Sequence, residues 1–132
     1  MTDKTLKLHQ MLALLPVSIP DCILDFLEDF TETNILEKVK AKSSLEPAFL
    51  QQNEILIKQQ LEALKSNAGS ITQVHAEAIG KEMPGAYLCK IVFENGIKGI
   101  GFNVKLKENV ISKIVTMTND YNVEELKKQL AS

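Results

Sequence analysis

The sequence predicts an α+β fold, in which N-terminal helices pack on one face of a curved antiparallel β-meander of about four strands and a short C-terminal helix follows. Helix-start signals and an apolar period near 3.6 residues fill the first half of the chain. Alternating apolar residues between turn signals fill residues 69–118. With 132 residues and 45% hydrophobic side chains, we expect a single domain: a helical half (1–67), a sheet (69–118) and a final helix (120–132).

Two helices are expected before residue 31. The first runs over Asp3–Leu15 and stops because Pro16 cannot continue a helix. The second begins after Ser18, since Asp21 follows it at capping-box spacing and Pro20 suits a first helical turn. The apolar stripe of this second helix comprises Ile23, Leu24, Phe26, Leu27 and Phe30.

A short third helix is expected over Asn34–Lys42. Ser43 and Glu46 then form a capping box that starts a long helix, either straight or bent. This helix ends at Asn67–Gly69, because glycine commonly closes helices. Its apolar residues at helical spacing are Phe49, Leu50, Leu56, Ile57, Leu61 and Leu64.

Asn95 and Gly96 predict a two-residue type I′ hairpin turn, because both residues tolerate positive φ. The turn pairs Phe93 with Lys98, and directly opposed residues share one face of a sheet. The pairs that follow are Ile91 with Ile100, Cys89 with Phe102 and Tyr87 with Val104. The predicted apolar face therefore holds Tyr87, Cys89, Ile91, Phe93, Ile100, Phe102, Val104 and Leu106.

The strand before this hairpin spans Ile71–Ile79, and we expect Gly80 to lie opposite Gly85. This register adds to the apolar face Val74, Ala76 and Ala78. The last strand, residues 110–118, has two registers open, because the turn before it can hold two or three residues. One register buries Ile111, Val115 and Met117, and the other buries Val110 and Ile114.

The closing helix, Asn122–Ala131, has a capping pair in Asn122 and Glu125, and its apolar residues are Val123, Leu126 and Leu130. The sheet face away from the N-terminal helices is also apolar and needs a cover. Two covers are open: this closing helix, or a second copy of the chain in a two-fold homodimer. The dimer face would consist of Leu88, Val92, Ile97, Gly99 and Gly101.

Composition argues against several classes of protein. A formal net charge of −2, mixed charges and no Trp argue against nucleic-acid binding. Residues 11–17 are too short to cross a membrane. Cys22 and Cys89 are expected to be buried free thiols; no metal ligand set is recognised and no cofactor is expected. We expect a cytoplasmic protein, although a chain that had lost a secretion signal would look the same.

Helices followed by a curved meander, with glycine near the middle of a strand, are typical of the cystatin-like superfamily. The segment from Gly85 to Ile114, with a turn before Ile111, resembles the final strands of that superfamily. The superfamily contains ketosteroid isomerase and nuclear transport factor two. The segment is most similar in style to small bacterial members of unknown function. The resemblance implies a cone between sheet and helices, which in the enzymes holds an Asp base and a Tyr or Asp donor. Here Tyr87 lies on the inner face without an acidic partner, so the resemblance supports the fold more than catalysis.

The sequence therefore favours a noncatalytic domain that binds a small apolar ligand or a protein partner, with no catalytic residue. The alternative is an isomerase or dehydratase that uses Tyr87 in a polar cone, with a carboxylate from the helices. A carboxylate of raised pKa near Tyr87 would favour the enzyme. A cone that is filled by phenylalanine side chains would favour the binding domain. The predicted ligand pocket consists of Tyr87, Cys89, Phe102, Thr72, Phe26 and Phe30.

Overall fold

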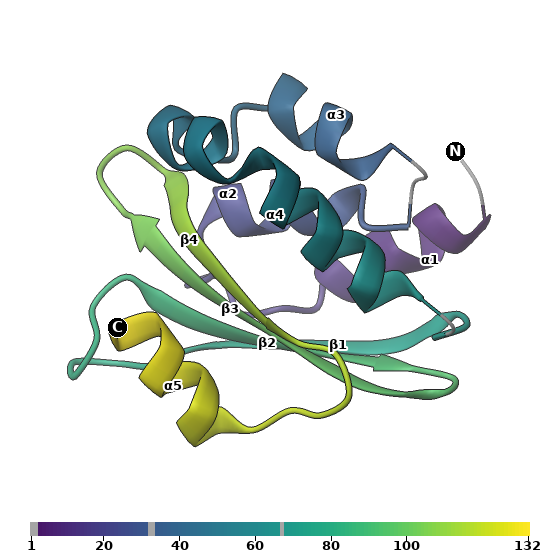
Figure 1. The fold of residues 1–132 in the computed structure, drawn as a ribbon. Coiled ribbons are helices and arrows are strands. Elements are labelled where there is room, and N and C mark those ends of the chain that lie inside the picture. Colours follow the sequence, from purple (N-terminus) through teal and green to yellow (C-terminus); the bar gives the residue numbers. More distant parts are fainter. Residues whose placement is uncertain (1–2, 32–33, 67) are drawn as a thin grey trace.

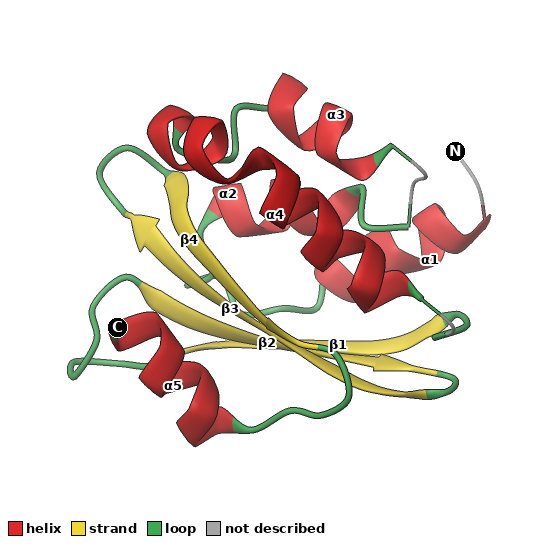
Figure 2. Ribbon diagram, viewed as in Figure 1, coloured by secondary structure: helices red, strands yellow, loops and turns green. Residues whose placement is uncertain are grey.

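The computed structural model describes residues 3–31, 34–66 and 68–132, and it has the predicted α+β architecture. Four helices cover one face of a curved antiparallel sheet of order β1-β2-β3-β4, and a fifth helix lies on the opposite face (Figure 1, Figure 2). The elements are α1 (Asp3–Leu12), α2 (Asp21–Glu28), α3 (Ile35–Ala41), α4 (Pro47–Lys65), β1 (Ile71–Ala78), β2 (Ala86–Phe93), β3 (Gly96–Lys105), β4 (Val110–Met117) and α5 (Val123–Ala131).

The start of α2 differs from the prediction, because Pro20 and not Ser18 precedes the first helical turn. Proline has no side-chain group that could cap a backbone N–H. The side chain of Asn109 supplies the acceptor instead, and its Oδ1 lies 3.1 Å from the Cys22 backbone nitrogen. Asn109 belongs to the turn between β3 and β4, so a distant hairpin caps this helix.

The long helix α4 is bent, which is one of the two forms that the sequence left open. The bend lies at Asn53, whose φ of −128° and ψ of 15° are not helical. The Asn53 side-chain amide donates a hydrogen bond to the Phe49 carbonyl at 2.9 Å. The predicted capping box is wrong, because Glu46 itself occupies the N-cap position and Pro47 follows it. Asn67, in the predicted helix end, lies outside the described residues.

The β2–β3 register differs from the predicted one by two residues. Phe93 pairs with Gly96, and Ile91 pairs with Lys98, so Glu94 and Asn95 form the hairpin loop. Backbone hydrogen bonds explain the shift: the Glu94 N–H donates to the Ser70 carbonyl at 2.9 Å, and the Asn95 N–H to the Ala68 carbonyl at 3.0 Å. An even shift leaves every side chain on its predicted face. Phe93, Ile100, Phe102 and Val104 are buried as predicted, whereas Leu106 is exposed.

The two other strand pairings combine a confirmed register with an unforeseen bulge. Ala78 pairs with Tyr87, which is the register expected from Gly80 opposite Gly85. Between β3 and β4 the register shifts by one residue near Ser112. Ile111 and Ile114 therefore both belong to the core beneath the helices. Val115 and Met117 belong to the cluster on the other face, so neither predicted register of the last strand is complete.

The outer face of the sheet is covered by α5. The Asn122 side chain accepts the Glu125 N–H at 3.0 Å, as the predicted capping pair requires. Leu126 and Leu130 pack against Leu88 and Val115, and all four side chains are buried. The Asn103 amide donates to the Leu130 carbonyl at 3.1 Å, and this bond anchors the end of α5 to β3.

The predicted dimer face is consequently mostly inaccessible. Leu88, Gly99 and Gly101 are buried, because α5, one of the two expected covers, lies over them. A Cβ atom on Gly99 would lie 3.2 Å from Leu126 Cδ1, so the glycine lets the helix approach the strand closely. The two other residues of this face are half-buried Val92 and exposed Ile97.

Candidate binding cavity

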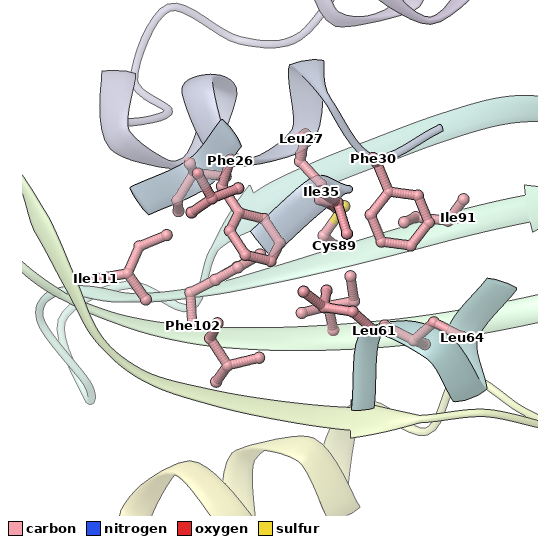
Figure 3. Close-up of a cluster of buried hydrophobic side chains, with 14 of the residues drawn as sticks. Phe26, Leu27, Phe30, Ile35, Leu61, Leu64, Cys89, Ile91, Phe102 and Ile111 are labelled. Carbon is pink, nitrogen blue, oxygen red and sulfur yellow. The ribbon is translucent and has the colours of Figure 1, made fainter. Parts of the chain in front are cut away.

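Most of the predicted pocket residues fill the core instead of lining a cavity. The rings of Phe26 and Phe102 meet edge to face, with centroids 5.5 Å apart (Figure 3). Phe30 and Cys89 pack in the same buried cluster. Thr72 lies apart from them on the exposed start of β1, where its hydroxyl donates to the Val92 carbonyl at 3.1 Å. Aromatic rings thus occupy the space that a ligand in the predicted cone would need.

The titratable groups of this core are held in their protonated forms. Burial raises the pKa of the Cys89 thiol to about 12 and that of the Cys22 thiol to about 11. Burial likewise raises the pKa of the Tyr87 phenol. Because the thiolate is the reactive form of cysteine, neither thiol is primed as a nucleophile at neutral pH. Over the part of the chain that the structure describes, no hydrogen bond joins the Tyr87 hydroxyl to a carboxylate.

An open cavity of about 540 Å³ lies between α1 and the start of β1, and we call it the α1–β1 cavity. This volume falls within the range usual for small-ligand sites. Its floor is apolar and includes the rings of Phe30 and Phe93, with centroids 6.4 Å apart. The remaining apolar lining residues are Leu8, Met11 and Ile71. Phe30 and Thr72 are the predicted pocket residues that line it.

The connection from α4 to β1 shapes one wall of this cavity. Gly69 has φ of 80°, a conformation that glycine adopts without strain, and it turns the chain from the helix into the sheet. The Ser70 N–H then donates to Glu94 Oε1 at 3.1 Å, while the Ser70 carbonyl accepts the Glu94 N–H. These two bonds hold the start of β1 against the β2–β3 turn.

The rim of the α1–β1 cavity carries more positive than negative side chains. Lys4 and Lys7 come from α1 and Lys65 from the end of α4, so segments far apart in the sequence supply the three ammonium groups. Asp3 and Glu94 are the two carboxylates among the lining residues, which leaves a surplus of one positive charge. Glu94 is already engaged with the Ser70 backbone. An apolar floor beneath a cationic rim suits a ligand with an apolar body and an anionic end.

Sequence reasoning missed this cavity because its wall residues are remote from one another along the chain. A partial signal existed in α1, where Lys4, Lys7 and Met11 recur at helical spacing and therefore share one helix face. Nothing local indicated that this face would meet Lys65 and Phe93. The predicted pocket was placed on the apolar face of the sheet. Side chains of the helices pack against the centre of that face.

A smaller hollow, of about 300 Å³, lies on the outer face between β1, β2 and the segment that leads into α5. His75, Glu77, Lys90 and Tyr121 line it. The Lys90 Nζ is 5.8 Å from the centre of the Tyr121 ring, a cation–π distance. Burial, followed by the negative charge of Glu77, raises the pKa of Tyr121 to about 12. The Lys90 ammonium group thus already contacts the face of the Tyr121 ring, and we assign this hollow a packing role.

Comparisons with family models, with curated proteins and with solved structures give no match to this chain. The resemblance to the cystatin-like superfamily therefore stays a prediction. Among the described residues, no group of three or more His, Cys, Asp or Glu side chains is placed to hold a metal ion. The helices within residues 3–31, 34–66 and 68–132 include none long and apolar enough to cross a membrane.

Proposed function

We propose that this chain is a noncatalytic binding domain whose ligand is a small amphiphilic anion held in the α1–β1 cavity. The observation that carries the proposal is an open cavity of about 540 Å³ with a phenylalanine floor and three lysines at its rim. A second observation supports the noncatalytic part: the inner cone is filled by the edge-to-face pair of Phe26 and Phe102. The proposal moves the ligand site from the predicted cone to the edge of the sheet.

The two halves of the cavity have separate roles in this proposal. Burial of an alkyl chain against Phe30, Phe93 and Leu8 supplies most of the affinity, at about 25 cal/mol per Å² of apolar surface. The lysines select for charge, but Lys4 and Lys7 are exposed, so each ion pair contributes only about 0.2–1 kcal/mol. We therefore expect moderate affinity and a preference of about fivefold for an anion over its uncharged analogue.

Titration with octanoate and with 1-octanol, followed by amide chemical shifts, tests the proposal. Octanoate should give saturable shifts in α1, at residues 69–72 and near Phe93, and octanol should bind more weakly. Met11→Trp places an indole in the cavity, since Met11 lines it, and should remove these shifts. Leu14→Trp is the matched control, because Leu14 is 87% exposed and outside the cavity lining.

The charge preference has its own pair of variants. Lys7→Gln should weaken octanoate binding and leave octanol binding unchanged, because only the anion uses the rim. Lys128→Gln, on exposed α5 surface across the sheet, should change neither. Equal binding by the parent chain and Met11→Trp, or shifts spread over the whole molecule, would overturn the proposed site.

A further inference from the structure

The two edge strands of the sheet, β4 and β1, differ in their backbone hydrogen-bond partners. Residues 44–46 run beside β4, where Leu45 forms a parallel bridge with Ile111. The Ile111 N–H donates to the Ser44 carbonyl and the Glu46 N–H to the Ile111 carbonyl, each at 2.8 Å. At the other edge, β1 has β2 as its one strand neighbour within the described chain. An edge strand presents outward backbone N–H and C=O groups that can pair with an added strand.

The β1 edge leads directly into the α1–β1 cavity. Ile71 and Thr72, the first residues of the strand, line the cavity. The pairing of β1 with β2 is irregular between Ile71 and Gln73, and from Gln73 to Ala78 it continues residue by residue. A regular exposed edge thus ends at a hollow with an apolar floor. Strand-addition sites combine these two parts, since the edge gives affinity and the hollow receives a side chain.

Strand direction decides which end of a peptide would reach the cavity. β1 runs from Ile71 to Ala78, so an antiparallel added strand ends beside Ile71, and its carboxyl terminus lies at the cavity rim. Lys4 and Lys7 are placed there to attract a carboxylate. A parallel peptide would bring its ammonium terminus to the same lysines and would be repelled.

We propose that β1 and the α1–β1 cavity bind the carboxyl-terminal segment of an extended peptide. The segment pairs antiparallel with Gln73–Ala78, its last side chain is apolar and enters the cavity, and its carboxylate lies beside Lys4 and Lys7. This inference rests on the proposed function, since it names a peptide terminus as the amphiphilic anion. The charge of the rim lysines and the direction of β1 together define the partner. It is a peptide that ends in an apolar residue with a free carboxylate.

The test uses an acetylated peptide of about six residues, Ser-Thr-Val-Ser-Thr-Leu with a free carboxylate, which in extended form matches the regular part of the edge. We expect amide shifts along β1 as well as at the cavity. A carboxamide terminus should weaken binding about fivefold, the same preference that the rim lysines give an anion over its uncharged analogue. N-methylation of alternate backbone nitrogens should weaken binding by a similar factor, because it blocks pairing on one side of the peptide while leaving the leucine and the carboxylate. Lys7→Glu should weaken the free-acid peptide more than the carboxamide, and Lys128→Glu should affect neither.

The outcomes separate this inference from the proposed function. If octanoate binds in the cavity but the peptide binds no better than its N-methylated form, the cavity site stands and strand addition is excluded. If neither octanoate nor the peptide binds, both proposals fail. If β1 amides become protected with rising protein concentration as a dimer forms, the edge belongs to a second copy of the chain, and the peptide proposal is overturned.

Discussion

Gly101→Ala should loosen the contact between α5 and the sheet. Gly101 lies on β3 opposite Val115, directly beneath the final turns of the helix. A Cβ atom at this position would lie 2.8 Å from Val115 Cγ2, 3.0 Å from Leu130 Cδ1 and 3.2 Å from Leu130 Cγ. All three distances are shorter than ordinary contact between carbon atoms. The added methyl group must therefore displace Leu130, Val115 or the strand.

The expected cost follows from these contacts. Overpacking a well-packed site typically costs about 1–3 kcal/mol. Replacing glycine by alanine within a strand returns about 0.5–1 kcal/mol, because the unfolded chain loses freedom. We therefore expect Gly101→Ala to lower the free energy of unfolding by about 0.5–2 kcal/mol, which corresponds to a fall in Tm of about 2–8 °C for a domain of this size.

Urea denaturation of four chains gives the assay: the parent, Gly101→Ala, Leu130→Ala and the double variant. Leu130 is 4% exposed, and truncating it should cost about 2–4 kcal/mol. In the Leu130→Ala background two of the three close contacts are gone, so Gly101→Ala should cost at least about 0.5 kcal/mol less. Strictly additive effects, or a Gly101→Ala chain as stable as the parent, would refute the close seating of α5 on β3.

Three further predictions follow from other parts of the fold. Phe102→Ala should lower the free energy of unfolding by about 3–5 kcal/mol, since the ring is fully buried against Phe26; Leu106→Ala, at an exposed side chain, should cost less than about 0.5 kcal/mol in the same denaturation experiment. Asn109→Gly keeps the positive φ of this position but removes the hydrogen bond to the Cys22 N–H, so we expect a loss of about 0.5–1.5 kcal/mol, and no loss would contradict the capping role. Burial, followed by repulsion from neighbouring acids, raises the folded-state pKa of Asp25 above its unfolded value, so the folded state binds the proton more tightly and stability falls as pH rises through the folded pKa. Asp25→Asn should therefore be more stable than the parent at pH 7, and this advantage should vanish below about pH 4, where both chains are neutral at that position; an advantage that grows in acid would reverse the argument.

The sequence predicted faces better than registers, and the physical reason is the period of a strand. Alternation places Phe102 and Cys89 on the buried side, whatever even shift the hairpin adopts. The true loop at Glu94–Asn95 depends on hydrogen bonds from the segment 68–70, which no local turn preference includes. The bulge near Ser112 likewise allows both Ile111 and Ile114 to reach the core, and alternation alone forbids that.

Long-range packing limited what could be predicted about the site. The existence of the helices followed from their apolar period; of the three predicted capping pairs, the one at Asn122 is present in the structure, and those at Ser18 and Ser43 are not. The choice between α5 and a second copy as the cover of the outer face was open, because Leu126 and Leu130 are apolar in either case. The α1–β1 cavity could not be predicted, since it depends on Lys7, Lys65 and Phe93 meeting across large sequence separations.

The hydrogen bond from Asn109 to the start of α2 also affects how the protein can be made. It joins residues 87 positions apart, so α2 has left the ribosome long before its cap is synthesised. A helix of eight residues is too short to persist alone in water. We therefore expect the N-terminal half to emerge without a stable α2, and to complete this helix only when the β3–β4 hairpin has formed. Synthesis of the β3–β4 hairpin then governs when the first half of the chain becomes ordered, which exposes Phe26 and Leu27 to aggregation during translation.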